Sequence, residues 1–443
     1  MDRLVQYLVY KKNPLRQLGL VGLKSLHLEA NPNQHKMILE KIHARFGPDF
    51  NLNNTQRTLA QFLCQESLYS NLFQKMASKI LFAGVVPILF LVIIAKSFKS
   101  YPRTKSKVFV YRYGDLGYLN SDFQDSEIQA IPTDRSTGNN LSWFDIKFFF
   151  KLLIESKFQY LFHPKLLVNI LRWVTSYSWV VKFYQPEVVA TFLEGTAASS
   201  VLTEYLNSQN IQHHNYAHGE HFRYDCYSAY ANFNRYVIWG EHFKNIQIEK
   251  NCRPEMFFTR APAAFVKFFY ETRHLKKIKS DQVTVLINSG VERGSTEYVN
   301  LVMLFNYLAD GTTVVLRPHP VDRASWPQVA DDLRTELDSV GKNLNWVTEL
   351  PENTPMKFSI IQSSIFIGPA SAALLEALLA GCKIIYIPNR VKNNDVIERH
   401  QKSRNVLFYS AETSSIQITE FLSAPFIINE AEDNKIKYLF KLD

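Results

Sequence analysis

Short apolar runs alternate with longer segments of helical pattern between Lys107 and Pro388. Each run is rich in β-branched, aromatic or other apolar residues and ends near a glycine, a proline or a polar residue, which is typical of buried parallel strands. The segments between them are long enough for crossover helices. The pattern predicts an α/β fold of doubly wound sheets. The expected strands are Lys107–Tyr111, Pro186–Phe192, Gln212–Ala217, Tyr236–Trp239, Val283–Asn288, Thr312–Leu316, Ser364–Ile367 and Lys383–Ile387.

The stretch from Ile360 to Pro388 has the pattern of strand, loop, helix and strand. Ser371–Ala380 is rich in Ala and Leu, which favour helix, and Gly381 can take the left-handed turn that ends it. The small residues Gly368 to Ser371 then lie at a helix N-terminus, where free N–H groups and the dipole attract anions. Glu376 is the one charged residue of this helix, and the alternative to a site role is an exposed position on an amphipathic surface.

The motif Arg317-Pro318-His319-Pro320 follows an expected strand, and open α/β sheets bind ligands outside the carboxyl ends of their strands. Two prolines fix the backbone around His319, whose imidazole can contact a phosphate or donate a proton to a leaving group. Arg317 is expected to help stabilise the departing phosphate. The alternative for His319 is a loop residue that only ends a strand. A second loop, Asn288–Ser295, offers two glycines for close backbone approach and Arg293 as a partner for phosphate.

Two residues of the first half of the chain also lie just after expected strands, as His319 does in the second half. Glu194 and His218 each follow an expected strand, and Glu194 also precedes a helix expected at Ala197–Asn207. Each could be a general base, although Glu194 could instead cap that helix. No metal site is expected, because Gly219 breaks the helical spacing among the neighbouring histidines and no Cys or clustered Asp lies near them.

The first 106 residues differ in charge from the rest: they hold 15 Lys and Arg against 5 Asp and Glu, whereas the remainder is nearly neutral. Helices are expected at Gln34–Phe46 and Thr55–Ser78, and an unbroken apolar run of 16 residues follows at Ile80–Ala95. A spanning helix needs about 20 apolar residues, and this run contains Pro87 and has basic flanks. We expect monotopic insertion at an anionic membrane surface, the alternative being a buried core helix or hairpin.

Composition and short motifs exclude several other classes of function. The loop Gly114-Asp115-Leu116-Gly117 is not a dinucleotide fingerprint, so no nicotinamide or flavin site is expected. Four scattered cysteines fit a reducing compartment, and no cleavable signal peptide is visible. Nucleic acid is not an expected partner, because the part after residue 106 is not basic and carries no binding motif for it. Aromatic residues in two further expected helices, Trp143–Phe158 and Pro164–Phe183, are interpreted as core or acceptor-side packing.

The His-Pro motif, the serine-containing loop and the glutamate helix, in this order, resemble the carboxyl-terminal domain of GT-B glycosyltransferases. The most similar groups build bacterial capsules, lipopolysaccharide and teichoic acids: sialyl- and Kdo-transferases and CDP-glycerol glycerophosphotransferases. The resemblance covers roughly 107–400 as an architecture and four or five short motifs specifically. It implies that His319 and Pro320 contact nucleotide phosphates and that Ser371 and Glu376 hold the phosphates and ribose.

The same resemblance bears on the two candidate bases. GT-B sialyltransferases carry an acidic-acidic-Gly motif whose second acid is the general base, and Glu194 matches that acid. Leu193 replaces the first acid, so the match is partial. His218-Gly219 is similar to the His-Gly motif of the CDP-glycerol transferases, where the histidine is a candidate base. Glu194 and His218 both remain candidates.

We therefore expect a GT-B fold, with a helical membrane-associating region at 1–106, two Rossmann-like domains at 107–270 and 282–425 that face a cleft, and a C-terminal helix at 426–443. The expected activity is metal-independent transfer of a sugar from a CMP- or UDP-type donor to a surface glycan or lipid-linked acceptor, with inversion implied by the resemblance. No cofactor beyond this co-substrate is expected. The expected location is the cytoplasmic face of the inner membrane.

Three alternatives to this function stay open at this point. The first is transfer of a polyol phosphate from CDP-glycerol, and the second is a sugar-nucleotide epimerase on the same fold. An epimerase lacks a membrane region, so residues 1–106 count against it. The third is a non-catalytic GT-B scaffold in a membrane polysaccharide assembly, which would have degraded motifs.

Overall fold

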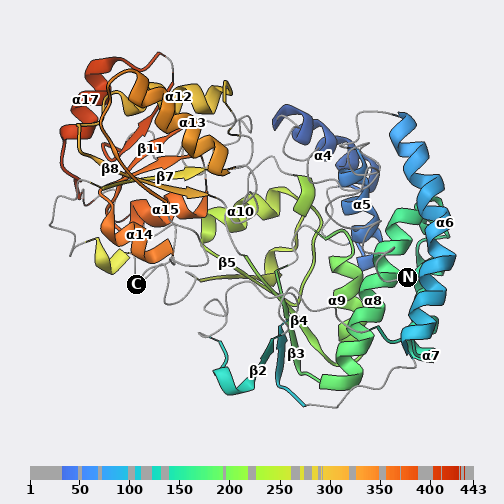
Figure 1. Ribbon diagram of the computed structural model, residues 1–443. Coiled ribbons are helices and arrows are strands. Elements are labelled where there is room, and N and C mark those ends of the chain that lie inside the picture. The colour runs from blue at the N-terminus through green and yellow to red at the C-terminus, as the bar shows by residue number, and fades with distance from the viewer. Residues whose placement is uncertain are drawn as a thin grey trace. The chain divides into compact units, whose positions relative to one another are not determined.

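The computed structural model describes residues 32–47, 52–67, 72–97, 105–110, 122–130, 139–192, 196–217, 226–260, 270–273, 282–287, 291, 293–318, 326–348, 356–369, 371–387, 403–410, 412–428, 430 and 434. The chain divides into two compact units, Met1–Arg260 and Ala261–Asp443. Each unit is built around a parallel sheet of six strands with helices packed against it (Figure 1). The expectation of two Rossmann-like α/β domains is confirmed at this level.

The first sheet has the strand order β2-β1-β3-β4-β5-β6, and every neighbouring pair is parallel. The direction of winding reverses between β1 and β3, so the switch point of the first sheet lies there. The strands are β1 Val108–Val110, β2 Ile128–Ala130, β3 Val188–Thr191, β4 Gln212–Tyr216, β5 Arg235–Ile238 and β6 Phe257–Thr259.

The N-terminal helices share one hydrophobic core with the first sheet. Side chains of α4, α5, α8 and α9 form a single buried cluster with Val189 of β3. Arg57 of α5 is 0% exposed, and its guanidinium donates to the carbonyls of Leu52 and Asn251 at 3.1 and 2.7 Å. The helices of this unit are α4 Pro32–Phe46, α5 Asn54–Glu66, α6 Leu72–Ser97, α7 Trp143–Glu155, α8 Pro164–Tyr184, α9 Ser199–Asn207 and α10 Glu241–Glu249.

The apolar run expected at Ile80–Ala95 lies within α6, which packs along α8 (Figure 1). Phe82, Leu89 and Ile93 are buried against Val168 and Leu171 of α8. The structure thus supports the core alternative for one face of this run, while other positions of α6 stay exposed. Among the residues that the structure describes, no helix combines the length and apolarity needed to cross a membrane.

The second sheet has the order β12-β11-β10-β7-β8-β9, again with only parallel neighbours. Counted within this unit, the order is 6-5-4-1-2-3, which is the Rossmann order of dinucleotide-binding folds. Its winding reverses between β7 and β10. The strands are β7 Gln282–Ile287, β8 Thr313–Pro318, β9 Asn345–Thr348, β10 Ile365–Gly368, β11 Lys383–Tyr386 and β12 Val406–Phe408.

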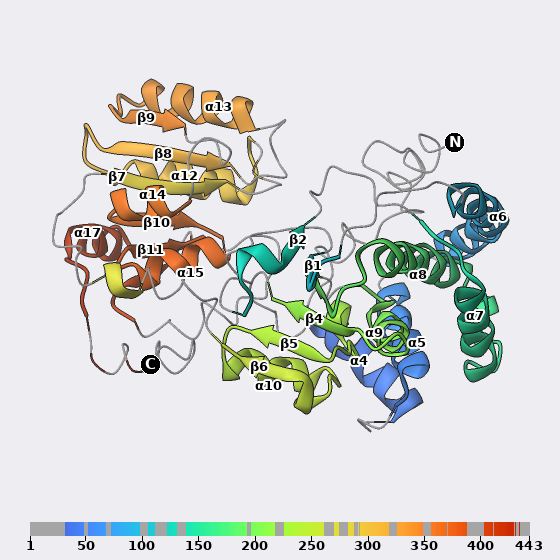
Figure 2. The same ribbon diagram turned by 90° about the horizontal axis from the view of Figure 1, so that it is seen from below.

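Helices cover both faces of the second sheet (Figure 2). Val285 and Leu316 pack into one core cluster with side chains of α12, α13 and α17. Thr284, the neighbour of Val285 in β7, points to the opposite face of the sheet. Its hydroxyl lies 2.5 Å from the hydroxyl of Ser363, which directly follows α14. The helices are α12 Thr296–Phe305, α13 Trp326–Ser339, α14 Met356–Gln362, α15 Ala372–Leu379 and α17 Ser415–Ser423. Short 3-10 turns in the chain lie at Asp125–Glu127, Gln159–Phe162, Cys226–Ser228 and Pro254–Met256.

The eight strands expected from the sequence are all present, and their ends differ from the expected ones by at most two residues. The residues expected to form one helix at Thr55–Ser78 instead belong to two successive helices, α5 and α6, and residues 68–71 between them lie outside the described part of the chain. Most of the residues between the two expected domains and most of the expected C-terminal helix at 426–443 also lie outside it. The four strands β2, β6, β9 and β12 were not expected.

Candidate functional site

The switch point of the second sheet is a place where two strands approach closely. Gly368 ends β10, and a Cβ placed on it would lie 2.9 Å from Cβ of Leu286 in β7 and 3.3 Å from the carbonyl oxygen of that residue. Real Cβ atoms do not come so near another carbon, so only glycine fits without a shift. Gly368 thus permits the close packing of β7 and β10 at the carboxyl edge of the sheet.

Helix α15 begins directly beyond this point. Ser371 is its N-cap, with an extended backbone, and its Oγ accepts a hydrogen bond from the amide of Leu374 at 3.2 Å. The expected small-residue loop before a helix N-terminus is therefore present, at the carboxyl edge of β10. Helix α12, which comes after β7, also starts with a serine cap, since Ser295 Oγ accepts from the amide of Tyr298 at 3.2 Å. Both strands of the switch point are followed by a capped helix start.

Glu376 lies inside α15 and is only 5% exposed. The alternative interpretation, an exposed position on an amphipathic surface, is wrong for this reason. A buried carboxylate must be hydrogen-bonded, paired or protonated to be tolerated. Contact of Glu376 with a nucleotide stays a prediction.

Arg317, next to the last residue of β8, is 4% exposed. Its Nη1 donates to the hydroxyl of Ser359 in α14 at 2.8 Å. Arg317 is the register partner of Leu286, so it belongs to the sheet face that α14 covers. In this position the guanidinium ties β8 to α14, and its contact with phosphate stays a prediction.

Arg293 has the opposite environment. It is exposed, in a turn with Gly294 just before the cap of α12, and Gly294 has φ +82°. This left-handed backbone favours glycine. The guanidinium of Arg293 is therefore open to solvent at a helix start that follows β7, although a phosphate contact stays a prediction here too.

Four of the candidate residues, Glu194, His218, His319 and Pro320, lie outside the described residues. The strands that precede them are described. β3 ends at Thr191, β4 at Tyr216 and β8 at Pro318. The expectation that these residues follow strand ends is confirmed, whereas the roles of their side chains stay predictions.

A polar cluster at the carboxyl end of β4 was not found from the sequence. Asp122 accepts a hydrogen bond from the hydroxyl of Tyr216 at 2.9 Å and one from Nη1 of Arg260 at 2.7 Å. Nη2 of Arg235 lies 3.7 Å from the same carboxylate, and its guanidinium stacks 4.0 Å from the ring centre of Phe258. Burial, with the charge of Asp122, raises the pKa of Tyr216 well above its usual value. Tyr216 is thus held as a neutral donor to Asp122.

On the other face of this sheet, His213 is held by a buried network. Its Nδ1 lies 2.7 Å from the hydroxyl of Thr203 and its Nε2 lies 3.2 Å from that of Thr191. Burial lowers the pKa of His213 to about 3, and burial together with Arg235 lowers that of His214 to about 4. Both imidazoles are neutral at pH 7. The network fixes Thr191, the last residue of β3, three positions before the candidate base Glu194.

No family model matches the sequence, and no curated protein matches it significantly. Several solved structures are similar at a distance. HepE of Anabaena in complex with UDP has 10% identity, with 76% of this chain and 92% of that chain covered and a TM-score of 0.41. UDP-GlcNAc 2-epimerase of Methanocaldococcus jannaschii in complex with UDP-GlcNAc and UDP has 10% identity, with 75% of this chain and 98% of that chain covered and a TM-score of 0.43. MurG of Acinetobacter baumannii has 12% identity, with 77% of this chain and 93% of that chain covered and a TM-score of 0.39. Similarity this distant carries no conclusion about activity or ligand.

Proposed function

We propose that this protein is a GT-B-type glycosyltransferase, which moves a sugar from a CMP- or UDP-type donor to a surface glycan or lipid-linked acceptor without a metal. The observation that supports this most is the Rossmann strand order of the second sheet. It places Gly368 and the capped start of α15 at the switch point between β7 and β10. Nucleotides bind at such switch points, outside the carboxyl ends of the strands.

The donor phosphates would lie against the N-termini of α12 and α15. Amide groups of a first helical turn and the positive end of the dipole stabilise phosphate charge there. Arg293, exposed beside the start of α12, would pair with phosphate. The resemblance described above adds His319 and Pro320 on the phosphates and Ser371 and Glu376 on the phosphates and ribose. Arg317 would help to stabilise the departing phosphate.

The chemistry would be a single displacement at the anomeric carbon. Glu194 or His218 removes the proton of the acceptor hydroxyl as its oxygen bonds to that carbon. The bond from the carbon to the donor phosphate breaks, and the phosphate leaves with the bonding electrons. Helix N-termini and basic groups stabilise its charge, and attack opposite the leaving group inverts the configuration.

The first experiment is a thermal-shift screen of the full chain with CMP, CDP, UDP and GDP. A ligand that binds only the folded state raises the melting temperature, so one of these nucleotides is expected to raise it. If none of the four does so at millimolar concentration, the proposal is wrong.

Two variants then separate the candidate bases. Removal of a positioned base lowers the rate by about 10²–10⁴. We expect Glu194→Gln to lower kcat by that order while the affinity for nucleotide stays near normal. We expect His218→Asn to act mainly on acceptor binding. Near-normal turnover of Glu194→Gln with an inactive His218→Asn would reverse the two roles.

A further inference from the structure

Helix α7 carries apolar side chains on two opposite faces. Phe148 and Leu152 are buried in the core of the first unit. Trp143, Phe150 and Ile154, by contrast, are exposed over 67%, 62% and 64% of their surface. These three residues follow the helical repeat and share one side of the helix. Large exposed apolar side chains gathered on one side of a helix mark an interaction surface, so the outer side of α7 suits a partner outside the described part of the chain.

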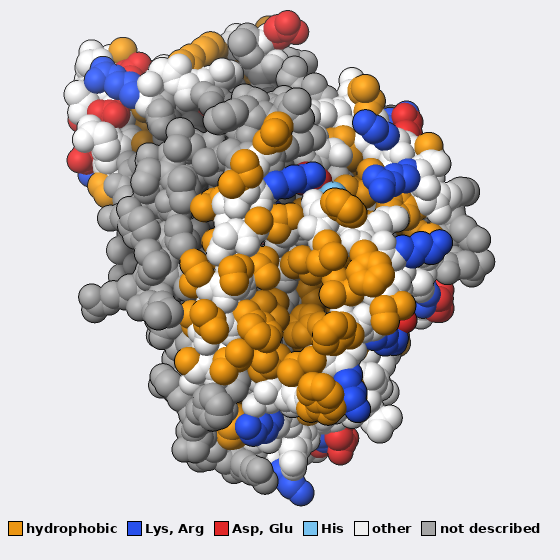
Figure 3. Space-filling model, turned by 90° about the vertical axis from the view of Figure 1, so that its right-hand side faces the viewer, with side chains coloured by type: hydrophobic (Ala, Val, Ile, Leu, Met, Phe, Trp, Pro, Cys, Tyr) orange, Lys and Arg blue, Asp and Glu red, His pale blue; other side chains and the backbone are white. Residues whose placement is uncertain are grey.

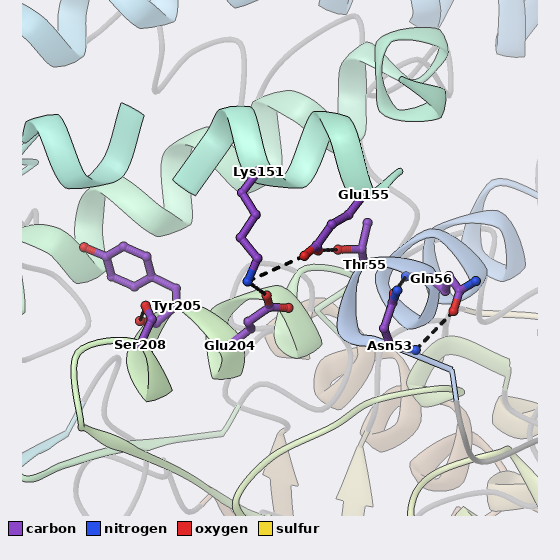
Figure 4. Close-up of polar contacts among 8 residues, drawn as sticks. All are labelled: Asn53, Thr55, Gln56, Lys151, Glu155, Glu204, Tyr205 and Ser208. Carbon is purple, nitrogen blue, oxygen red and sulfur yellow. Dashed lines mark hydrogen bonds and ion pairs between the residues drawn. The ribbon is translucent and has the colours of Figure 1, made fainter. Parts of the chain in front are cut away.

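Polar contacts fix which side of α7 faces outward (Figure 4). Lys151 forms ion pairs with Glu155 at 3.6 Å and with Glu204 of α9 at 2.5 Å, and Glu155 accepts a hydrogen bond from Thr55 of α5 at 2.8 Å. At the other end of the helix, the buried carboxylate of Asp145 accepts from the hydroxyls of Ser142, Ser178 and Tyr205 at 2.7–2.8 Å. The contacts to Glu204, Thr55, Ser178 and Tyr205 join α7 to other helices, and they hold the apolar outer side in place because turning α7 inward would break them.

The apolar surface extends from α7 onto α6. Phe149 of α7 packs against the buried cluster that α6 and α8 share. Hydrophobic side chains gather on the side of the molecule where these helices lie (Figure 3). We call this surface the α6–α7 face and define it by six exposed residues, Ile80, Leu91, Trp143, Phe144, Phe150 and Ile154. An open hollow of about 530 Å³ lies along α7 within it.

The charges around the α6–α7 face are mainly positive (Figure 3). Lys147 is exposed, and its Nζ lies 5.9 Å from the ring centre of Trp143. Lys79 is exposed on α6. The exposed acid of α7, Glu155, is already engaged by Lys151. A second copy of the chain would bring lysines against lysines, which is unfavourable, whereas anionic lipids match both the apolar surface and the charge.

We propose that the α6–α7 face docks this protein onto the surface of an anionic lipid bilayer. Trp143, Phe150 and Ile154 enter the boundary between headgroups and acyl chains, and Lys147 meets lipid phosphates. This differs from insertion of Ile80–Ala95 by itself, because one face of that run is buried in the protein. Helix α7, whose aromatic residues were expected to pack in the core or near the acceptor, supplies the main contact. The inference stands without the proposed function.

The test is co-sedimentation of the full chain with vesicles of phosphatidylglycerol and phosphatidylcholine, and with vesicles of phosphatidylcholine alone. The double variant Phe150→Asp with Ile154→Asp is expected to lower partition onto the anionic vesicles about tenfold or more. Ile416→Asp is the matched control, since Ile416 is 67% exposed on α17 of the second unit, and it is expected to bind normally. The melting temperature of each variant shows that it is folded.

Charge reversal gives a second, milder variant. Lys147→Glu is expected to lower partition onto anionic vesicles at least about fivefold, the effect of losing one lysine, and to leave binding to neutral vesicles unchanged. The proposal is overturned if the wild type does not bind anionic vesicles, or if all variants bind as it does. It is also overturned if the α7 variants instead turn a dimer into a monomer in sedimentation velocity, because the face then joins two copies.

Discussion

Gly368 and Leu286 lie so close that a methyl group on the glycine would sit 2.9 Å from Cβ of the leucine. The contact joins β10 to β7 across the point where the winding of the second sheet reverses. The glycine therefore sets the spacing of the two strands beside the proposed phosphate site.

We expect Gly368→Ala to lower the free energy of unfolding by about 1–3 kcal/mol, because an added methyl in a packed core forces strand or side-chain shifts. Urea denaturation measures this. Gly84→Ala is the control, since nothing lies within 4 Å of a Cβ at Gly84 in α6, and alanine should raise stability by about 0.5–1 kcal/mol there. An unchanged stability of Gly368→Ala would mean that β7 and β10 separate at little cost.

Two serine caps allow a matched test of the phosphate site. Ser371 caps α15, and Ser414 caps α17, where its Oγ accepts from the amide of Gln417 at 3.3 Å. Each change to alanine should cost about 1 kcal/mol of stability through the lost cap. Only Ser371→Ala should also weaken nucleotide binding, measured by titration calorimetry. Equal affinity of the two variants would place the nucleotide away from α15.

The bond between Arg317 and Ser359 predicts a structural effect. Ser359→Ala removes an acceptor from a buried guanidinium, and we expect a loss of about 1–3 kcal/mol in the free energy of unfolding. If Arg317 acts mainly by holding α14 to β8, nucleotide affinity should change little. A large loss of affinity without a loss of stability would instead favour direct contact of Arg317 with phosphate.

Buried His213 predicts acid sensitivity. Its pKa in the folded protein is about 3, below the usual value near 6.5, so in the window between them the unfolded state binds the additional proton. The contribution of neutral His213 to the free energy of unfolding is therefore fully present above pH 6.5. It is lost as the pH falls toward 3, with a slope of up to about 1.4 kcal/mol per pH unit. His213→Gln should be less stable at pH 7 but should show a shallower loss in chemical denaturation from pH 6.5 to 4. An unchanged slope would contradict the neutral, buried state.

The interior strands could be predicted from the sequence, and the edge strands could not. The strands that were missed, β2, β6, β9 and β12, are the four outer strands of the two sheets. β9, for example, alternates exposed and half-buried positions. An edge strand has a neighbour on one side and less burial, so its apolar signal is weak. Interior strands such as β10 are buried throughout, which gives a continuous apolar run.

Parts of the candidate site could likewise be predicted from the sequence, and other parts could not. Gly368 and Ser371 could be placed because one local stretch specifies strand, loop and helix. The cluster around Asp122 could not, because its partners Tyr216 and Arg260 are 94 and 138 positions away. The exposure of α7 was also missed, since a helix with two apolar faces has the composition of a core helix.

Arg57 has a mechanical consequence for the first unit. Helix α5 cannot move away from the turn after α10 without breaking the hydrogen bond from Arg57 to the carbonyl of Asn251, and losing a buried partner of this kind typically costs about 1–3 kcal/mol. Because α4, α5, α8 and α9 also share one buried core with β3, we expect the helices and the sheet of this unit to move together. If the protein rests on a membrane through its α6–α7 face, any tilt of the protein on that membrane would turn the carboxyl ends of β3 and β4 by the same angle. The angle of approach of an acceptor would then be set by how the protein rests on that surface.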